Sequence, residues 1–195
     1  TIHWIFFYGS IKFSNISIGV VCYCLTSFFT AVLEPIINKK RFSAVQLMLS
    51  MLTLIGISLI FHFDSSYQLG IILGVISTIF AALYTIYNEQ LVKQYDSKLL
   101  NFYQMLSGTI VLGFGLPIFY YLFPTERFIP SFSDGVYLIL LALFCTVGLY
   151  VLFAESLKKL SAFTVNLSFN LEPIYSIIIA FLFFNEGKQV NASFY

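Results

Sequence analysis

Six predominantly apolar runs, each long enough to cross a lipid bilayer, make up most of the 195-residue chain. Each run is about 19 to 25 residues long, and a transmembrane helix needs about 20. The runs do not alternate strictly between apolar and polar residues, as the strands of a membrane barrel do. Because backbone polar groups in lipid must pair within their own segment, we predict helices. The runs are Ile16–Ile37, Ala44–Phe63, Leu69–Tyr87, Leu99–Phe123, Gly135–Ala154 and Ala162–Phe184.

The composition favours the same fold class. Hydrophobic residues make up 59% of the chain and charged residues only 10%, whereas soluble domains carry about 25% charged residues. A net charge of +1 gives no electrostatic basis for a nucleic-acid partner. The sequence therefore predicts an all-α integral membrane protein, a polytopic helical bundle whose surroundings are the lipid bilayer.

The basic residues between the runs predict the orientation. Seven of the ten Lys and Arg residues fall in alternate loops, and three fall in the intervening ones. The positive-inside rule places the side with seven in the cytoplasm. The seven are Lys39, Lys40, Arg41, Lys93, Lys98, Lys158 and Lys159, and the three are Lys12, Arg127 and Lys188. Apolar segments at the two ends, Thr1–Tyr8 and Val190–Tyr195, are too short to span, and we interpret them as parts of longer helices.

Two of the long runs resemble each other. Ser10–Ser14 opens one and Ser156–Ser161 opens the other, and both runs end in short polar turns, Asn38–Arg41 and Asn185–Lys188. The predicted orientation makes the first opener external and the second internal. Similar segments of opposite orientation are typical of the inverted repeats of secondary transporters.

The most informative ionisable residue is Glu172, near the middle of the last full run and directly before Pro173. A carboxylate at that depth is costly and usually faces a bundle interior or a water-filled cavity. Pro173 lacks an N–H and crowds the carbonyl of Phe169, so we expect it to open the helix. Interrupted helices at the membrane midplane are where transporters place their binding sites.

Further polar residues follow helical spacing. Ser168 and Glu172 belong to one i, i+4 series, Asn166 and Asn170 to a second, and Thr30 and Glu34 to a third in an earlier run. His3 is a candidate cavity residue near the start of the chain. The alternative is that these groups only join helices by hydrogen bonds. The candidate substrate- or proton-binding residues are Glu172, Ser168, Asn170, Pro173, Glu34, Thr30 and His3.

Sequence signatures of catalysis, cofactors or metals are absent. No His-Glu-x-x-His, Gly-x-Ser-x-Gly or phosphate-binding glycine loop occurs. Cys22 and Cys24 lie about 200° apart around a helix, which disfavours a shared metal. We therefore predict no catalytic residue, no metal and no cofactor.

Two stretches resemble the EamA family of the drug/metabolite transporter superfamily. One is ESLKKLSAFTVNLSFNLEP, residues 155–173, followed by an apolar run to Glu186; Pro173 and Glu186 match the family's mid-helix proline and terminal glutamate. The other is FAALYTIYNEQLVK, residues 80–93, which resembles the sixth helix of the family and the loop after it. The first repeat departs from the pattern, with Thr26 at the position of Pro173 and Lys39 at that of Glu186.

The resemblance implies an inverted five-plus-five helix repeat that is truncated here. Helices 1 and 2 and most of helices 3 and 10 would be missing. Residues 1–63 would then end the first repeat, and residues 67–195 would form most of the second. It implies a multi-pass protein of the plasma membrane, the bacterial inner membrane, and leaves a homodimer open.

The sequence thus predicts a secondary transporter that moves a small metabolite by alternating access. A small-molecule substrate that is neutral, zwitterionic or cationic is favoured, because no Lys or Arg lies deep in a run. Two alternatives stay open, an intramembrane enzyme that uses Glu172 and a membrane scaffold without transport.

Overall fold

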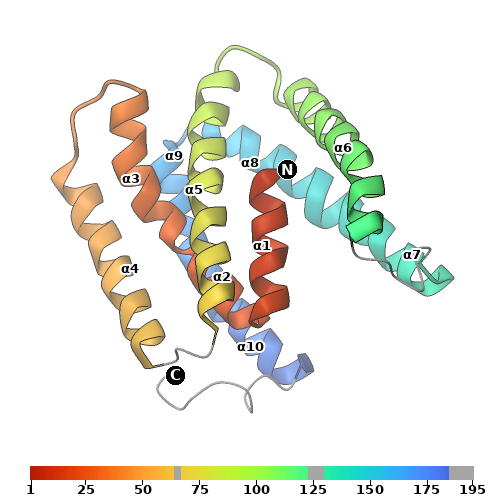
Figure 1. Ribbon diagram of the computed structural model, residues 1–195. Helices are drawn as coiled ribbons and strands as arrows, with labels where there is room; N and C mark the ends of the chain where they lie inside the picture. The colour runs from red at the N-terminus through yellow and green to blue at the C-terminus, as the bar shows by residue number, and fades with distance from the viewer. Residues whose placement is uncertain (64–66, 123–129, 185–195) are drawn as a thin grey trace. The chain divides into compact units, whose positions relative to one another are not determined.

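The computed structural model describes residues 1–63, 67–122 and 130–184, and all regular structure in those ranges is helical (Figure 1). Over their described residues, all six predicted runs coincide with helical stretches, so the predicted all-α fold is confirmed. Glu186, Arg127 and the segment Val190–Tyr195 lie outside the described residues. The elements are α1 (Ile2–Phe13), α2 (Ile16–Tyr23), α3 (Leu25–Ile37), α4 (Ala44–Phe63), α5 (Gln68–Leu91), α6 (Ser97–Leu122), α7 (Phe132–Leu140), a π-helix (Leu141–Gly148), α8 (Leu149–Leu157), α9 (Ala162–Ser168), a 3-10 turn (Phe169–Leu171) and α10 (Glu172–Phe184).

Four of the helical stretches within the described ranges are long and apolar enough to cross a membrane. They are Ile16–Ile37, Gln68–Leu91, Ser97–Tyr121 and Phe132–Leu157. In the last two, the most apolar part is not buried in the protein at all. Apolar helices with this exposure are stable in lipid, where their side chains need no protein cover.

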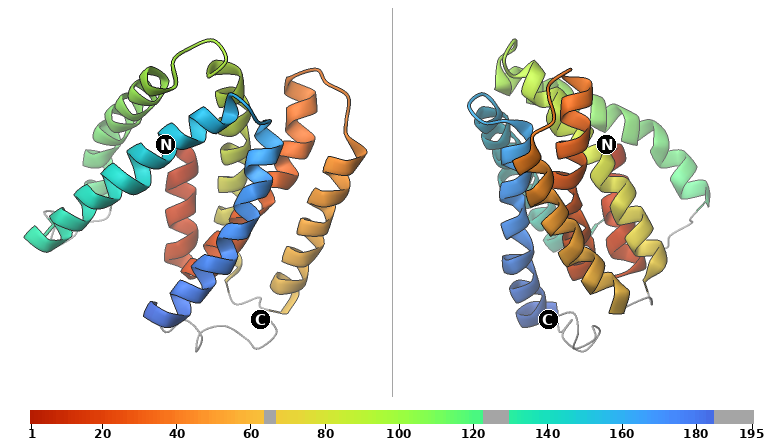
Figure 2. Two further views of the ribbon diagram at one scale, coloured as in Figure 1. Left: turned by 180° about the vertical axis from the view of Figure 1, so that it is seen from behind. Right: turned by 90° about the vertical axis from the view of Figure 1, so that its left-hand side faces the viewer.

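The chain divides into two compact units. The major unit comprises Ile2–Tyr87 and the chain from Leu160 onward, and the minor unit comprises Asn88–Lys159 with Thr1. In the major unit, α3 packs on α4 as a helical hairpin, and α9 and α10 pack along α3 and α2 (Figure 2). Residues far apart in sequence therefore meet inside the major unit.

Small residues let α1, α2 and α5 approach closely in the major unit. Ser10 is fully buried, and its hydroxyl donates to the carbonyl of Gly70 at 2.7 Å. A Cβ on Gly74 would lie only 2.7 Å from Cβ of Cys22. Close approach through small residues and interhelical hydrogen bonds is how helices associate where lipid removes the hydrophobic driving force.

In the minor unit, the run predicted as one α-helix over Gly135–Ala154 contains a π-helix at Leu141–Gly148. The predicted uniform α-helix is thus wrong in its central part. The Thr146 hydroxyl donates to the carbonyl of Leu141, five residues back, at 3.3 Å. Apolar periodicity does not separate an i+4 from an i+5 pattern over so short a stretch, so the sequence carried no signal for the wider turn. Asn101 of α6 then donates to the carbonyl of Tyr150 at 3.0 Å and joins α6 to α8.

Asp96 caps the start of α6. One carboxylate oxygen accepts from the backbone N–H groups of Leu99 and Lys98, both at 3.0 Å. These bonds, the one from Leu99 foremost, with smaller contributions from the charges of Lys158 and Lys98, lower the pKa of Asp96 from its usual value. The cap satisfies N–H groups that have no partner within the helix.

We expect Asp96→Ala to lower the unfolding temperature at neutral pH. Because the folded-state pKa is lowered, the stabilisation is present above the unfolded pKa, near 4, and is lost as the pH falls through the lower folded value. Thermal unfolding in detergent at pH 7 and pH 3 measures this, and the difference between wild type and variant should shrink at pH 3. Asp96→Ser, which caps without a charge, is the control and should show a smaller pH dependence. An equal loss in the alanine variant at both pH values would contradict the role of the carboxylate.

Candidate functional site

Two interrupted helices cross in the major unit. The first run is divided at Cys24 into α2 and α3, and the last at the 3-10 turn Phe169–Leu171 into α9 and α10. The first half of each pairs with the second half of the other, α2 with α10 and α3 with α9 (Figure 2, left). The two helices are therefore antiparallel, and their interruptions meet. We call this region the helix crossing.

The interruption in the last run falls where Pro173 predicts one, but its consequence differs from the expectation. In an unbroken α-helix the carbonyl of Phe169 would accept from residue 173, which is a proline without an N–H. The backbone N–H of Glu172 donates to that carbonyl instead and forms the 3-10 turn. The tighter turn thus supplies a donor for the carbonyl of Phe169 one residue earlier.

Asn166 joins three helices through both ends of its amide. Its NH2 donates to the hydroxyl of Thr30 at 2.7 Å, and its carbonyl oxygen accepts from the hydroxyl of Thr85 at 3.2 Å. Asn166 is only 1% exposed, and Thr30 and Thr85 are also buried. Since a buried amide without partners costs free energy, this network stabilises the contact of α9 with α3 and α5.

Asn170, four residues on, uses only one end of its amide. Its NH2 donates to the hydroxyls of Ser27 at 3.3 Å and Thr53 at 3.2 Å. Its carbonyl oxygen is buried and has no hydrogen-bond partner in the described structure. An unpaired buried acceptor is uncommon in folded proteins. Asn170 is thus the predicted candidate whose geometry most resembles that of a binding group.

His3 lies at the same crossing. Its Nδ1 is 3.1 Å from the carbonyl of Ser77 and 2.7 Å from the Ser77 hydroxyl, which donates to the His3 carbonyl at 3.0 Å. The imidazole ring lies 5.5 Å from the ring of Tyr23, and that ring lies 6.2 Å from Phe169 in the 3-10 turn. An aromatic series therefore connects His3 with the residue next to Asn170.

The other predicted residues of the last run lie differently. Ser168 and Glu172 are exposed, and the Ser168 hydroxyl donates to the carbonyl of Thr164 of its own helix at 2.9 Å. Glu172 is the first residue of α10, and Pro173 follows it in the first turn. The helix crossing thus brings together His3, Thr30 and Asn170, and the side chains of Ser168 and Glu172 lie outside that network.

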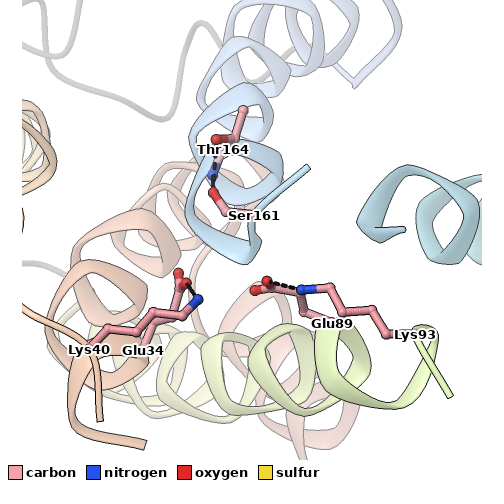
Figure 3. A network of polar contacts seen from close by, with 6 residues as sticks. All are labelled: Glu34, Lys40, Glu89, Lys93, Ser161 and Thr164. Atoms are coloured by element: carbon pink, nitrogen blue, oxygen red, sulfur yellow. Dashed lines mark hydrogen bonds and ion pairs between the residues drawn. The ribbon is translucent and has the colours of Figure 1, made fainter. Parts of the chain in front are cut away.

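Glu34 is more deeply buried than its position near the end of a run predicts. It is 5% exposed; one carboxylate oxygen lies 3.2 Å from Nζ of Lys40, and the other is buried without a partner in the described structure (Figure 3). The turn after α3 brings Lys40 back, with Lys39 at a φ of 50°. The lysine at the helix end therefore covers the carboxylate of Glu34.

Sequence reasoning missed several polar residues. In the minor unit, Glu89 is 3% exposed and pairs with Lys93 at 2.7 Å (Figure 3). The i, i+4 spacing of this pair was a usable signal. Ser27, Thr53, Ser77 and Thr85 carried none, because hydroxyl residues are common in membrane helices and only the fold shows which ones meet an amide or an imidazole.

Long apolar helices, exposed apolar surface and a buried polar crossing define a multi-pass α-helical membrane protein. A family model described as the EamA-like transporter family matches residues 68–191. The chain belongs to the EamA-like transporter family, as the resemblance of its motifs predicts.

A relative from Clostridium kluyveri described as an uncharacterized transporter is 21% identical over 195 residues. The match covers 93% of this chain and 60% of that relative. The chain thus spans about 60% of the length of the curated relative that it matches. No solved structure matches the chain.

Proposed function

We propose that this protein is part of a secondary transporter that moves a small solute across the bacterial inner membrane by alternating access. The observation that carries the proposal is the antiparallel pair of interrupted helices with a half-used amide, Asn170, at the interruption. Interrupted helices near the midplane form the sites of many transporters, and rocking of helix bundles around them exchanges access. Membership of the transporter family and the transporter-named relative support it.

In this proposal residues 1–63 and 67–195 belong to two inverted repeats. The antiparallel pairing of α2–α3 with α9–α10 supports an inverted relation. Asn170 and His3 bind the solute, and Glu172 binds the solute or a proton. Thr30 belongs to the network that fixes the crossing, and Ser168 and the backbone next to Pro173 border the path. The solute is neutral, zwitterionic or cationic.

Solute flux through the full-length protein in proteoliposomes tests the proposal. We expect Glu172→Gln to lower the flux at least tenfold, or to reduce the change of flux with pH at least tenfold. The reason is that a neutral amide cannot exchange a proton or pair with a cation. Glu155→Gln is the matched control: Glu155 is also exposed at a helix and pairs with Lys158, so its flux should equal that of wild type.

Unchanged flux and pH dependence in Glu172→Gln would remove Glu172 from the site. A wild-type protein that moves no solute would instead favour a scaffold, and the transport proposal would fail.

A further inference from the structure

Two hydroxyl hydrogens fix the orientation of the Asn170 amide. The hydroxyl of Ser27 donates to the carbonyl of Cys24 at 3.0 Å, and that of Thr53 donates to the carbonyl of Leu49 at 3.3 Å. Both hydroxyl oxygens accept from the NH2 group of Asn170. The NH2 group therefore faces them, and the carbonyl oxygen Oδ1 faces away. Oδ1 is the buried atom without a partner in the described structure.

Asn166 differs from Asn170 in the hydrogen-bond partners of its amide. The two amides lie one turn apart, yet Asn166 meets an acceptor on one side, Thr30, and on the other the hydroxyl of Thr85, which is shared with the carbonyl of Ala81. At Asn170 the missing partner is a hydrogen-bond donor, because a carbonyl oxygen can only accept.

One of the two neutral tautomers of His3 provides a second acceptor. With its hydrogen on Nδ1, His3 donates to the carbonyl of Ser77 at 3.1 Å. The Ser77 hydroxyl donates to the His3 carbonyl and lies 2.7 Å from the same Nδ1. In the neutral imidazole, Nε2 is then the acceptor.

Aromatic rings surround this second acceptor. The centroid of the His3 ring lies 5.6 Å from the ring centroid of Trp4, 5.9 Å from that of Phe7 and 5.5 Å from that of Tyr23. The faces of aromatic rings attract cations, most strongly where water is excluded. Tyr23 precedes Ser27 by one helical turn and contacts Phe169, so the rings continue to the Asn170 side of the crossing.

Positive charge is scarce around these acceptors. In the major unit, within the described ranges, the cationic side chains of Lys and Arg are Lys12, in the last turn of α1, and Lys39, Lys40 and Arg41, in the turn after α3. Glu172, at the start of α10, adds a further acceptor when ionised. The unpaired acceptors at the crossing therefore favour a positively charged donor.

We propose that the helix crossing recognises the ammonium group of a primary amine, with Asn170 Oδ1 as the acceptor that determines specificity and His3 Nε2 as the second. The inference rests on the proposed transport function. A primary ammonium carries three N–H donors, enough for both acceptors. A quaternary ammonium has the same charge but no N–H, so it isolates the contribution of hydrogen bonding from that of charge.

The test uses the full-length protein in proteoliposomes loaded with three solute series of matched carbon skeleton. These are primary amines (glycine, alanine), their N-trimethyl counterparts, and the hydroxy acids in which a hydroxyl replaces the amine (glycolate, lactate). Flux is measured by mass spectrometry. We expect amines to move and the trimethyl and hydroxy-acid series to move at least tenfold more slowly. Asn170→Leu should lower amine flux about 10- to 100-fold, mainly through KM, since it removes a charge-assisted hydrogen bond.

Asn170→Asp keeps the acceptor and gives a second variant if the leucine variant does not fold. It should retain the preference for amines, and loss of that preference would contradict the assignment. Equal flux of amines and trimethyl analogues, or faster flux of the hydroxy acids, would overturn the inference and leave transport standing. If no solute of any series moves, the proposed function fails, and the inference fails with it.

Discussion

The double substitution Thr30→Val and Thr85→Val is expected to lower the free energy of unfolding by about 4 kcal/mol. Both changes keep the shape of the side chain but remove the hydroxyls that pair with Asn166. Asn166 is 1% exposed, so its NH2 and carbonyl would stay buried without partners. A stranded buried polar group costs about 1–3 kcal/mol, and two such groups give the estimate.

A third substitution distinguishes the loss of hydrogen bonds to Asn166 from a loss of packing. Asn166→Leu, added to the double variant, removes the stranded amide, so the triple variant should be more stable than the double. Asn166→Leu alone should lower the free energy of unfolding less than the double substitution does. The Thr30 and Thr85 hydroxyls keep their bonds to the carbonyls of Thr26 and Ala81 in that variant. Unfolding by SDS in mixed micelles measures all four proteins. A triple variant less stable than the double would show that Asn166 contributes by packing rather than by pairing.

Gly74→Val is expected to cost about 3 kcal/mol, at the upper end of the effect of overpacking a core. A Cβ at this position would lie 2.7 Å from Cβ of Cys22, 2.8 Å from its Sγ and 3.0 Å from Oγ of Ser10. Cys22 and Ser10 are both fully buried, so neither can turn outward to make room. The unfolding temperature in detergent and the yield of monodisperse protein measure the effect.

The chain supplies a matched control and a rescue for this substitution. Gly113 of α6 has no atom within 4 Å of an added Cβ, so Gly113→Val should leave stability unchanged or raise it slightly, since glycine is a poor helix former. Combining Gly74→Ala with Cys22→Gly adds a methyl group on one side of the contact and removes the side chain on the other. The double variant should therefore recover much of the stability that Gly74→Ala loses. Equal losses at Gly74 and Gly113 would show that the close approach does not matter.

The sequence by itself determined the lipid-embedded helical fold. The need to pair backbone groups inside lipid leaves one local solution for a run of about 20 apolar residues, so helix positions follow from the residues alone. Pro173 likewise fixed the place of one interruption, because a residue without an N–H cannot continue the hydrogen-bond series. The motifs around it were enough to indicate the family.

The tertiary structure alone decided which polar residues meet. Asn166 and Asn170 look equivalent in the sequence, yet one finds a donor and an acceptor and the other only acceptors, because their partners come from helices more than 80 residues away. Thr30, a candidate for binding, pairs with Asn166, and Glu34 is covered by Lys40. Helical spacing places a residue on a face of its own helix, whereas the packing of other helices decides what that face contacts.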